Sequence, residues 1–182
     1  KQHVMLPDYD STLTNNGGAD QYTIDVKGNT VAIVNADLLQ GVIAWKSTDG
    51  GDNWQRIIVD TFKYAPWTGK TEMLDTPYTN DGTVDVIIDN NNKLHVFFGL
   101  GRVLDTDTTD ESYSFYPGTQ GMMHWSEATD KTSLIASGNQ FDRDEDGFNG
   151  LEQATYAALS GGNVPSGLST VARLGSTSAL RQ

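Results

Sequence analysis

Residues 16–34 read N-G-G-A-D-Q-Y-T-I-D-V-K-G-N-T-V-A-I-V, and residues 80–97 read N-D-G-T-V-D-V-I-I-D-N-N-N-K-L-H-V-F. Each stretch runs through an apolar and polar alternation, turns at a cluster of Gly, Asn or Asp, and resumes an apolar run, which is the pattern of a β-hairpin. The two stretches lie about 63 residues apart, and similarity at such a spacing indicates an internal repeat. The sequence therefore predicts a fold built from copies of one sheet-forming unit.

Each hairpin is followed by two further strand patterns. Residues 41–45 read G-V-I-A-W and residues 121–125 read G-M-M-H-W, and both then enter an acidic turn. A fourth strand is expected at residues 55–60 in the first copy and at residues 132–136 in the second. Four strands in a fixed order are typical of a β-propeller blade. We therefore expect an all-β fold of antiparallel four-stranded blades.

The repeat units extend over approximately residues 16–79 and 80–160, and a third unit is expected to start at residues 161–182. Together they make residues 1–182 a single β-propeller segment. A blade has two apolar faces that neighbouring blades must cover, and closed propellers have about four to eight blades. We therefore expect an incomplete propeller segment, which further blades of a longer chain or other subunits complete.

Composition narrows the function classes. The chain of 182 residues has 24 acidic and 12 basic side chains, a net charge of −12, and no cysteine. This charge repels nucleic acids and anionic lipids, and no run of residues is apolar enough to insert into a membrane. The absence of cysteine excludes disulfides, thiolate nucleophiles and cysteine-ligated metals. A chain rich in Gly, Asn, Asp, Ser and Thr that forms short strands fits a secreted or cell-surface bacterial protein.

The turn after the first G-V-I-A-W strand carries a family resemblance. Residues 47–54 read S-T-D-G-G-D-N-W, which resembles the Asp-box, S-x-D-x-G-x-x-W, of BNR-repeat propellers in the sialidase-like superfamily. Its motif positions are Ser47, Asp49, Gly51 and Trp54, while Asn53 stands where the family usually has Thr or Ser. We expect Asp49 to accept backbone hydrogen bonds within the turn and Trp54 to fold beneath it, a structural role. The alternative is a ligand role for Asp49 or Asp52.

The same resemblance sets a test for enzymatic activity. A sialidase needs an arginine trio, a tyrosine nucleophile paired with a glutamate, and an acid/base carboxyl group, and none of the five arginines stands in the family's F/Y-R-I-P motif. We therefore expect no catalytic residue and no organic cofactor, and interpret the chain as a non-catalytic binding or scaffold module. The alternative is a fragment of a sialidase-like glycoside hydrolase whose catalytic residues lie outside this segment.

The strongest metal candidate is the acidic stretch D-R-D-E-D-G-F-N-G-L-E-Q at residues 142–153. Asp142, Asp144 and Asp146 alternate before a glycine, as in the first half of an EF-hand loop, and Glu152 offers a fourth carboxylate one residue earlier than the EF-hand pattern. Hard carboxylate oxygens at this spacing predict calcium as the ligand. The alternative is an acidic turn that is only solvated.

A long loop, expected between residues 98 and 121, distinguishes the second copy from the first. It combines acidic and aromatic residues, among them Asp105, Asp107, Tyr113 and Tyr116. Aromatic faces beside hydrogen-bonding groups suit a protein or glycan partner, and the alternative is a cap over the edge or face of a blade. His95 and His124 lie in strand patterns and could face each other, either as a metal pair or as a hydrogen-bonded pair.

Overall fold

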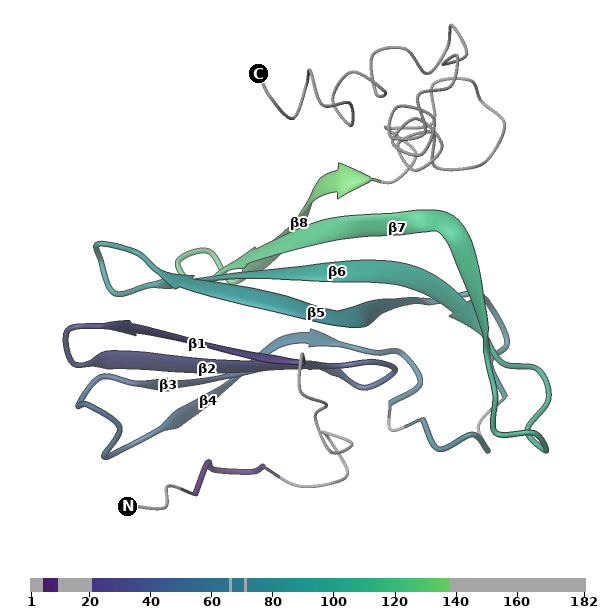
Figure 1. Ribbon diagram of the computed structural model, residues 1–182, viewed down its shortest axis with the longest axis horizontal. Coiled ribbons are helices and arrows are strands. Elements are labelled where there is room, and N and C mark those ends of the chain that lie inside the picture. The colour runs from purple at the N-terminus through teal and green to yellow at the C-terminus, as the bar shows by residue number, and fades with distance from the viewer. Residues whose placement is uncertain (1–4, 10–20, 66, 71, 138–182) are drawn as a thin grey trace, which may run out of the picture. The chain divides into compact units, whose positions relative to one another are not determined.

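The computed structural model describes residues 5–9, 21–65, 67–70 and 72–137 (Figure 1). This part of the chain is all-β and contains eight strands and no helix. None of these residues forms a helix long and apolar enough to cross a membrane. The expected third repeat unit at residues 161–182 lies outside the described residues.

The first sheet contains β1 (Tyr22–Lys27), β2 (Thr30–Asp37), β3 (Gly41–Ser47) and β4 (Gln55–Thr61). Neighbours in sequence are antiparallel neighbours in the sheet, so the order is β1-β2-β3-β4. The turn between β1 and β2 needs only two residues because Gly28 adopts a φ of 60°, which side-chain-bearing residues avoid.

The second sheet repeats this plan with β5 (Tyr78–Ile88), β6 (Leu94–Leu104), β7 (Ser114–Ser126) and β8 (Lys131–Ser137), again in sequence order. All eight predicted strands are present, and the prediction of two four-stranded antiparallel sheets is confirmed. Strands β5, β6 and β7 are longer than expected. The register of β5 against β6 shifts between Asn80 and Val84, where Gly82 has a φ of 86°.

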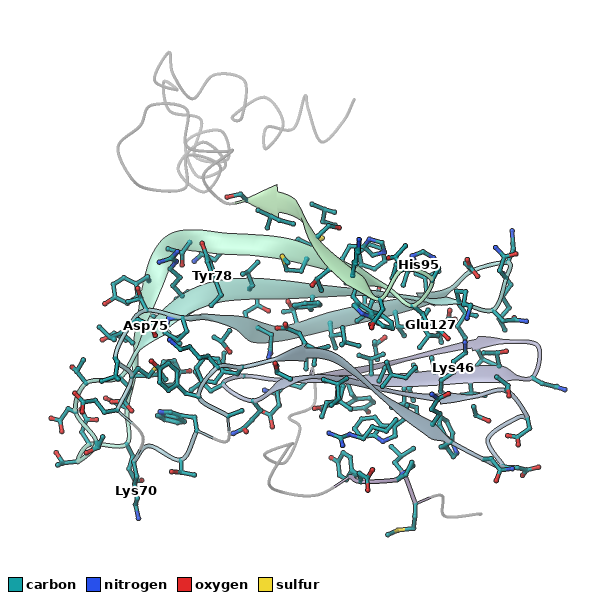
Figure 2. The ribbon with its side chains drawn as sticks, turned by 180° about the vertical axis from the view of Figure 1, so that it is seen from behind. Lys46, Lys70, Asp75, Tyr78, His95 and Glu127 are labelled. Atoms are coloured by element: carbon teal, nitrogen blue, oxygen red, sulfur yellow. The ribbon has the colours of Figure 1, made fainter. Side chains whose placement is uncertain are left out.

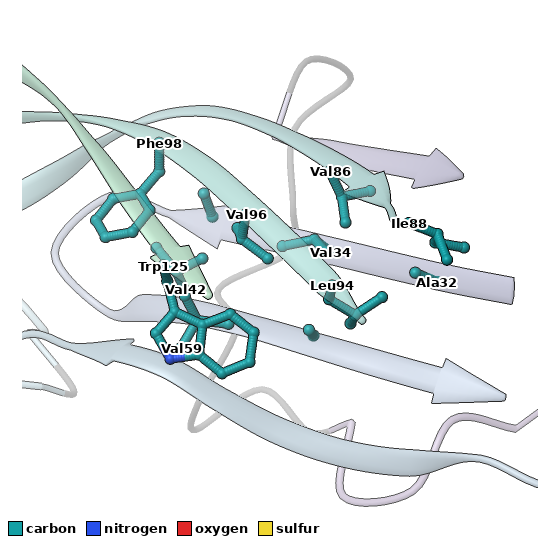
Figure 3. Packing of buried hydrophobic residues seen from close by; sticks show 12 residues of the cluster. Ala32, Val34, Val42, Val59, Val86, Ile88, Leu94, Val96, Phe98 and Trp125 are labelled. Atoms are coloured by element: carbon teal, nitrogen blue, oxygen red, sulfur yellow. The ribbon is translucent and has the colours of Figure 1, made fainter. Parts of the chain in front are cut away.

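The two sheets pack face to face around one apolar core (Figure 3). All strands of both sheets belong to one compact unit, apart from residues 117–120 of β7 and residues 136–137 of β8. The first sheet supplies mostly small residues and the second sheet larger ones. The core members are Ala32, Val34, Ala36, Val42, Ala44 and Val59 from the first sheet, and Val86, Ile88, Leu94, Val96, Phe98 and Trp125 from the second. We call these two surfaces the inner faces and the opposite surfaces the outer faces.

A second apolar cluster lies where the strands connect. Its buried members are Leu39, Phe62, Met73 and Val103. Trp67 and Tyr113 pack against it from the two long connections, with their rings edge to face at a centroid distance of 5.4 Å. This cluster therefore ties the link between the sheets, which contains Trp67, to the connection between β6 and β7, which contains Tyr113.

Candidate functional site

The turn between β3 and β4 carries the residues that resemble an Asp-box, and its polar groups bond to one another. Ser47 Oγ lies 2.7 Å from Asp49 Oδ1 and accepts the N–H of Gly51 at 2.9 Å. Asp49 Oδ1 accepts the N–H of Asn53 at 2.9 Å, and Asp49 Oδ2 accepts its side-chain amide at 2.7 Å. Asn53, which departs from the family pattern, thus provides a side-chain donor to the same carboxylate.

Trp54 closes this turn from below. Its indole Nε1 donates to the carbonyl of Gly51 at 2.8 Å, and Gly50 and Gly51 have φ values of 78° and 100°. The hydrogen bonds from the Asn53 side chain, the Asn53 backbone and Ser47 lower the pKa of Asp49 to about 2. Both carboxylate oxygens are therefore engaged within the turn, which is the geometry of a structural element rather than of a ligand site.

The segment between residues 98 and 121 is not the long loop that its composition suggested. β6 continues to Leu104 and β7 begins at Ser114, so only residues 105–113 connect the strands. The expectation of a loop over the whole segment was wrong. The extra residues extend the β6–β7 hairpin because Arg102, Val103 and Leu104 pair with Tyr116, Phe115 and Ser114.

Two of the four residues proposed for a ligand loop are used in packing. Asp105 is only 2% exposed, accepts the Trp67 indole N–H at 3.0 Å through Oδ2, and accepts the Asp107 N–H at 3.2 Å through Oδ1. Tyr113 packs against Trp67, and burial raises the pKa of its hydroxyl. This end of the hairpin covers the second apolar cluster.

Asp107 and Tyr116 lie away from this contact. Asp107 Oδ1 accepts the Thr109 hydroxyl at 2.6 Å and the Thr109 N–H at 3.0 Å, and these bonds lower the pKa of Asp107. Tyr116 lies in β7 and is 36% exposed. The hollow between Asp105 and Tyr113 has a volume of only ≈ 80 Å³, which is far below the roughly 300–1,000 Å³ of ligand pockets.

The acidic loop with Asp142, Asp144, Asp146 and Glu152 lies outside the described residues. Within residues 5–9, 21–65, 67–70 and 72–137, no group of three or more His, Asp or Glu side chains could hold a metal ion. Calcium therefore remains a prediction from the sequence.

His95 and His124 do face each other across β6 and β7. His95 Nδ1 lies 2.9 Å from His124 Nε2, the rings are parallel to within 9°, and their centroids are 5.1 Å apart. Because the centroid separation exceeds the nitrogen separation by about two ring radii, the two nitrogens point at each other and do not converge on a third atom. The pair is therefore a hydrogen bond rather than a metal site. The carboxylate of Asp89, 3.6 Å from His95 Nε2, favours a proton on that nitrogen, so that His124 donates to His95.

An ion pair fastens the two sheets at one end of the core (Figure 2). Lys46 Nζ on β3 lies 2.7 Å from Glu127 Oε2 in the turn after β7, and it also donates to the carbonyl of Asn92. Glu127 Oε2 accepts the Leu94 N–H at 2.8 Å as well. Lys46 is 8% exposed and Glu127 19% exposed. Sequence reasoning missed this pair because its members are 81 residues apart and neither belongs to a motif.

An uncovered apolar surface lies on the outer face of the first sheet. Ile24 and Val26 on β1 are 54% and 59% exposed, and Tyr22 and Ile58 are exposed to a similar degree. Trp45, by contrast, is covered on this face, because its indole donates to the Pro7 carbonyl at 2.8 Å and its ring packs against Tyr9. The uncovered part therefore lies over β1, with Ile58 on β4 exposed as well.

The strand registers relate this outer face to a buried surface of the second sheet. Ile24 pairs with Ile33, which pairs with Trp45; Val86 pairs with Val96, which pairs with Trp125. The adjacent rows correspond in the same way: each of these outer-face positions of the first sheet has a register-equivalent position on the inner face of the second. These rows are Tyr22–Asn35–Ile43 with Val84–Phe98–Met123, and Val26–Val31 with Ile88–Leu94.

It follows that the outer face of the first sheet occupies the position that, in the second sheet, is buried against a neighbour. Sequence reasoning predicted that both faces of a blade are apolar, and the register now shows which face is covered. The uncovered face of the first sheet is the candidate functional site. No known protein family, curated protein or solved structure matches the chain.

Proposed function

We propose that the chain is a non-catalytic scaffold and binding module of the propeller type, whose sheets act as blades and which binds a protein partner through the outer face of the first sheet. One observation carries this proposal: the row Ile24–Ile33–Trp45 faces outward in the register that the row Val86–Val96–Trp125 uses to pack against a sheet. This surface is apolar at the register positions that are buried in the second sheet, and no sheet among the described residues covers it. It is therefore suited to pack against a further sheet.

The kind of partner follows from the surface. Tyr22, Ile24 and Val26 form a broad apolar strip along the edge strand β1. Glycans need concave sites with several convergent polar groups, whereas a flat apolar sheet face packs against another sheet at about 10 Å. A protein partner that presents a sheet therefore fits better than a sugar. We also propose that the protein is exported or at the cell surface of a bacterium, which its richness in Gly, Asn, Asp, Ser and Thr supports.

The proposal of a non-catalytic role is supported by how the carboxylates are used. The pKa values of Asp49, Asp75, Asp89 and Asp107 are lowered, chiefly by hydrogen bonds. A general acid of a glycosidase needs a raised pKa and a second carboxylate across the scissile bond. Burial raises the pKa of Asp60, but Asp60 lies within β4 opposite Val42 rather than in a cleft with a second acid.

A matched pair of substitutions tests whether the outer face is a binding surface. Ile24→Thr and Val86→Thr change register-equivalent positions on the edge strands β1 and β5 to the same β-branched residue. In dilute protein, Val86→Thr should lower the free energy of unfolding by about 1–3 kcal/mol, and Ile24→Thr by less than about 0.5 kcal/mol. Denaturant unfolding followed by circular dichroism measures both.

Equal losses for the two variants would mean that the chain already buries Ile24 within itself, and the binding role of this face would then be wrong. The catalytic alternative has its own assay, with fluorogenic glycosides that include sialosides. We expect no turnover. If the rate of hydrolysis rises in proportion to the concentration of the purified chain, the scaffold proposal is wrong and the chain is a glycoside hydrolase.

A further inference from the structure

Among the residues that the structure describes, the second sheet also has one face with exposed apolar side chains. Its outer face carries Ile87, Phe97 and Met122, and Ile87 and Met122 are 51% and 47% exposed. A hollow of ≈ 180 Å³ opens there between Asp85, Phe97 and Met122. The described part of the chain therefore has one open apolar face on each sheet.

These two open faces differ in kind. In the register correspondence, the inner face of the first sheet matches the outer face of the second, so that Ala36 corresponds to Gly99 and Val42 to Met122. The outer face of the first sheet matches the inner face of the second. The sheet packing observed in this chain joins one face of each kind. The open outer face of the second sheet corresponds to the inner face of the first, and the open outer face of the first sheet corresponds to the inner face of the second. The two open faces are therefore complementary in the same way as the two inner faces that pack within the chain.

We propose that the outer face of the first sheet binds the outer face of the second sheet of another copy of this chain, in a head-to-tail arrangement. This inference rests on the proposed function and names the partner of the same surface. Such an interface is heterologous, because each copy contributes a different surface. Back-to-back pairing of two first sheets would instead join two copies of the same outer face. The packing within the chain joins two faces that do not correspond in register.

The charges at the corresponding positions agree with this arrangement. Within the chain, Lys46 of the first sheet binds Glu127 of the second across the packed faces. Between copies, the position of Lys46 is taken by Ser126 and that of Glu127 by Ser47. Ile87 likewise stands where the first sheet has Asp25. At these three positions, therefore, stacking two copies buries no unpaired charge.

The overall charge sets the expected dependence on salt. Two copies, each with a net charge of −12, repel each other at long range, and the interface itself lacks the lysine–glutamate pair. Added salt screens this repulsion. Association should therefore strengthen with salt, whereas an interface held by ion pairs would weaken.

Sedimentation velocity of the full chain over a range of concentrations tests the inference. The wild type should shift from monomer to higher mass as concentration rises. Ile24→Asp on the first sheet and Met122→Asp on the second should each abolish the shift. Leu74→Asp, at an 84% exposed position in the link between the sheets, is the matched control and should behave as wild type. Circular dichroism establishes that each variant is folded.

A mixture of the two blocked variants separates head-to-tail from symmetric pairing. The Ile24→Asp chain keeps an intact second sheet and the Met122→Asp chain an intact first sheet, so the mixture should form a heterodimer and stop there. A monomeric wild type at its highest soluble concentration would overturn the inference. So would loss of association in Ile24→Asp alone, or a mixture that stays monomeric. The stability comparison of Ile24→Thr with Val86→Thr does not depend on this result, so the binding role of the face can stand while this partner fails.

Discussion

Lys46 Nζ and Glu127 Oε2 lie 2.7 Å apart and join β3 of the first sheet to the turn that follows β7 in the second. This pair stands at the rim of the shared core, with Lys46 more deeply buried than Glu127. The same carboxylate also accepts the backbone N–H of Leu94, which holds Glu127 in place for this contact between the sheets.

We expect Glu127→Gln to destabilise the packing of the sheets, because it leaves the buried ammonium of Lys46 without its counter-ion. The loss should be about 1–2 kcal/mol, below the roughly 3–5 kcal/mol of a fully buried pair, since solvent reaches Glu127. Denaturant unfolding measures it. The control is Lys63→Ala, which breaks the exposed pair with Asp75 and should cause no measurable change. Equal effects of the two substitutions would contradict a special role for Lys46–Glu127.

Glu127 should also make the fold sensitive to acid. Burial raises the pKa of its carboxyl, but the hydrogen bonds from Lys46 and Leu94 and the charges of Lys46 and Lys93 outweigh that effect, so the pKa is lowered from 4.5. A lowered pKa stabilises the fold above the unfolded value, and this contribution is lost as the pH falls below 4.5 through the folded pKa. The pH dependence of unfolding in this range should be shallower in Glu127→Gln than in wild type.

Asp49→Ala should loosen the turn between β3 and β4. The substitution removes the acceptor of the Asn53 N–H, whose amide should then exchange with deuterium faster. Because the pKa of Asp49 is lowered from 3.8 to about 2, the stability that its carboxylate contributes should be lost as the pH falls from 3.8 to about 2. Asp52→Ala in the same turn is the control, and an equal gain in exchange there would argue against a specific role for Asp49.

The histidine pair predicts a second pH range. Burial of His124, followed by the nearby charge of His95, lowers the pKa of His124 below 6.5. The unfolded chain therefore binds more protons between the folded pKa and 6.5, and stability should fall as the pH drops through that range. Two-dimensional NMR of the imidazoles measures the titration directly. His124→Gln should remove this part of the pH dependence, and an unshifted His124 titration in the folded wild type would contradict the prediction.

Calcium binding is expected at Asp142, Asp144, Asp146 and Glu152. Adding a chelator should lower the melting temperature of the chain, and Asp144→Asn should bind calcium more weakly in titration calorimetry, because it removes one charged oxygen ligand. Asp110→Asn, an acidic residue outside this loop, is the control. A melting temperature that does not respond to the chelator would remove calcium from the account of this protein.

How far the sequence predicted the fold depends on the range of the interactions. The strands around Ile24, Ile33 and Trp45 were predictable because alternation and turn residues are local signals. The extension of β6 to Leu104 was not, because Gly99 and Gly101 break the apolar pattern there. Gly101 leaves room for the Phe115 ring, which would meet any added Cβ at 2.6 Å. Only the folded hairpin reveals that requirement.

The candidate site divides in the same way. The roles of Asp49 and Trp54 followed from turn chemistry within eight residues. The burial of Asp105 did not, because its indole partner Trp67 lies 38 residues away. The cover of Trp45 by Pro7 and Tyr9 was likewise invisible, since an isolated stretch near the start of the chain gives no periodic signal. Contacts between distant segments decide which side chains of a motif remain available to a ligand.

Each sheet is made by one uninterrupted stretch of chain, the first ending at Thr61 and the second beginning at Tyr78, and neither lends a strand to the other. A gene duplication with its breakpoints in that connecting stretch would add an entire four-stranded layer without rethreading the polypeptide. The number of layers can therefore change in whole steps during evolution or in the hands of a protein engineer, with each new end inheriting a surface that requires a cover.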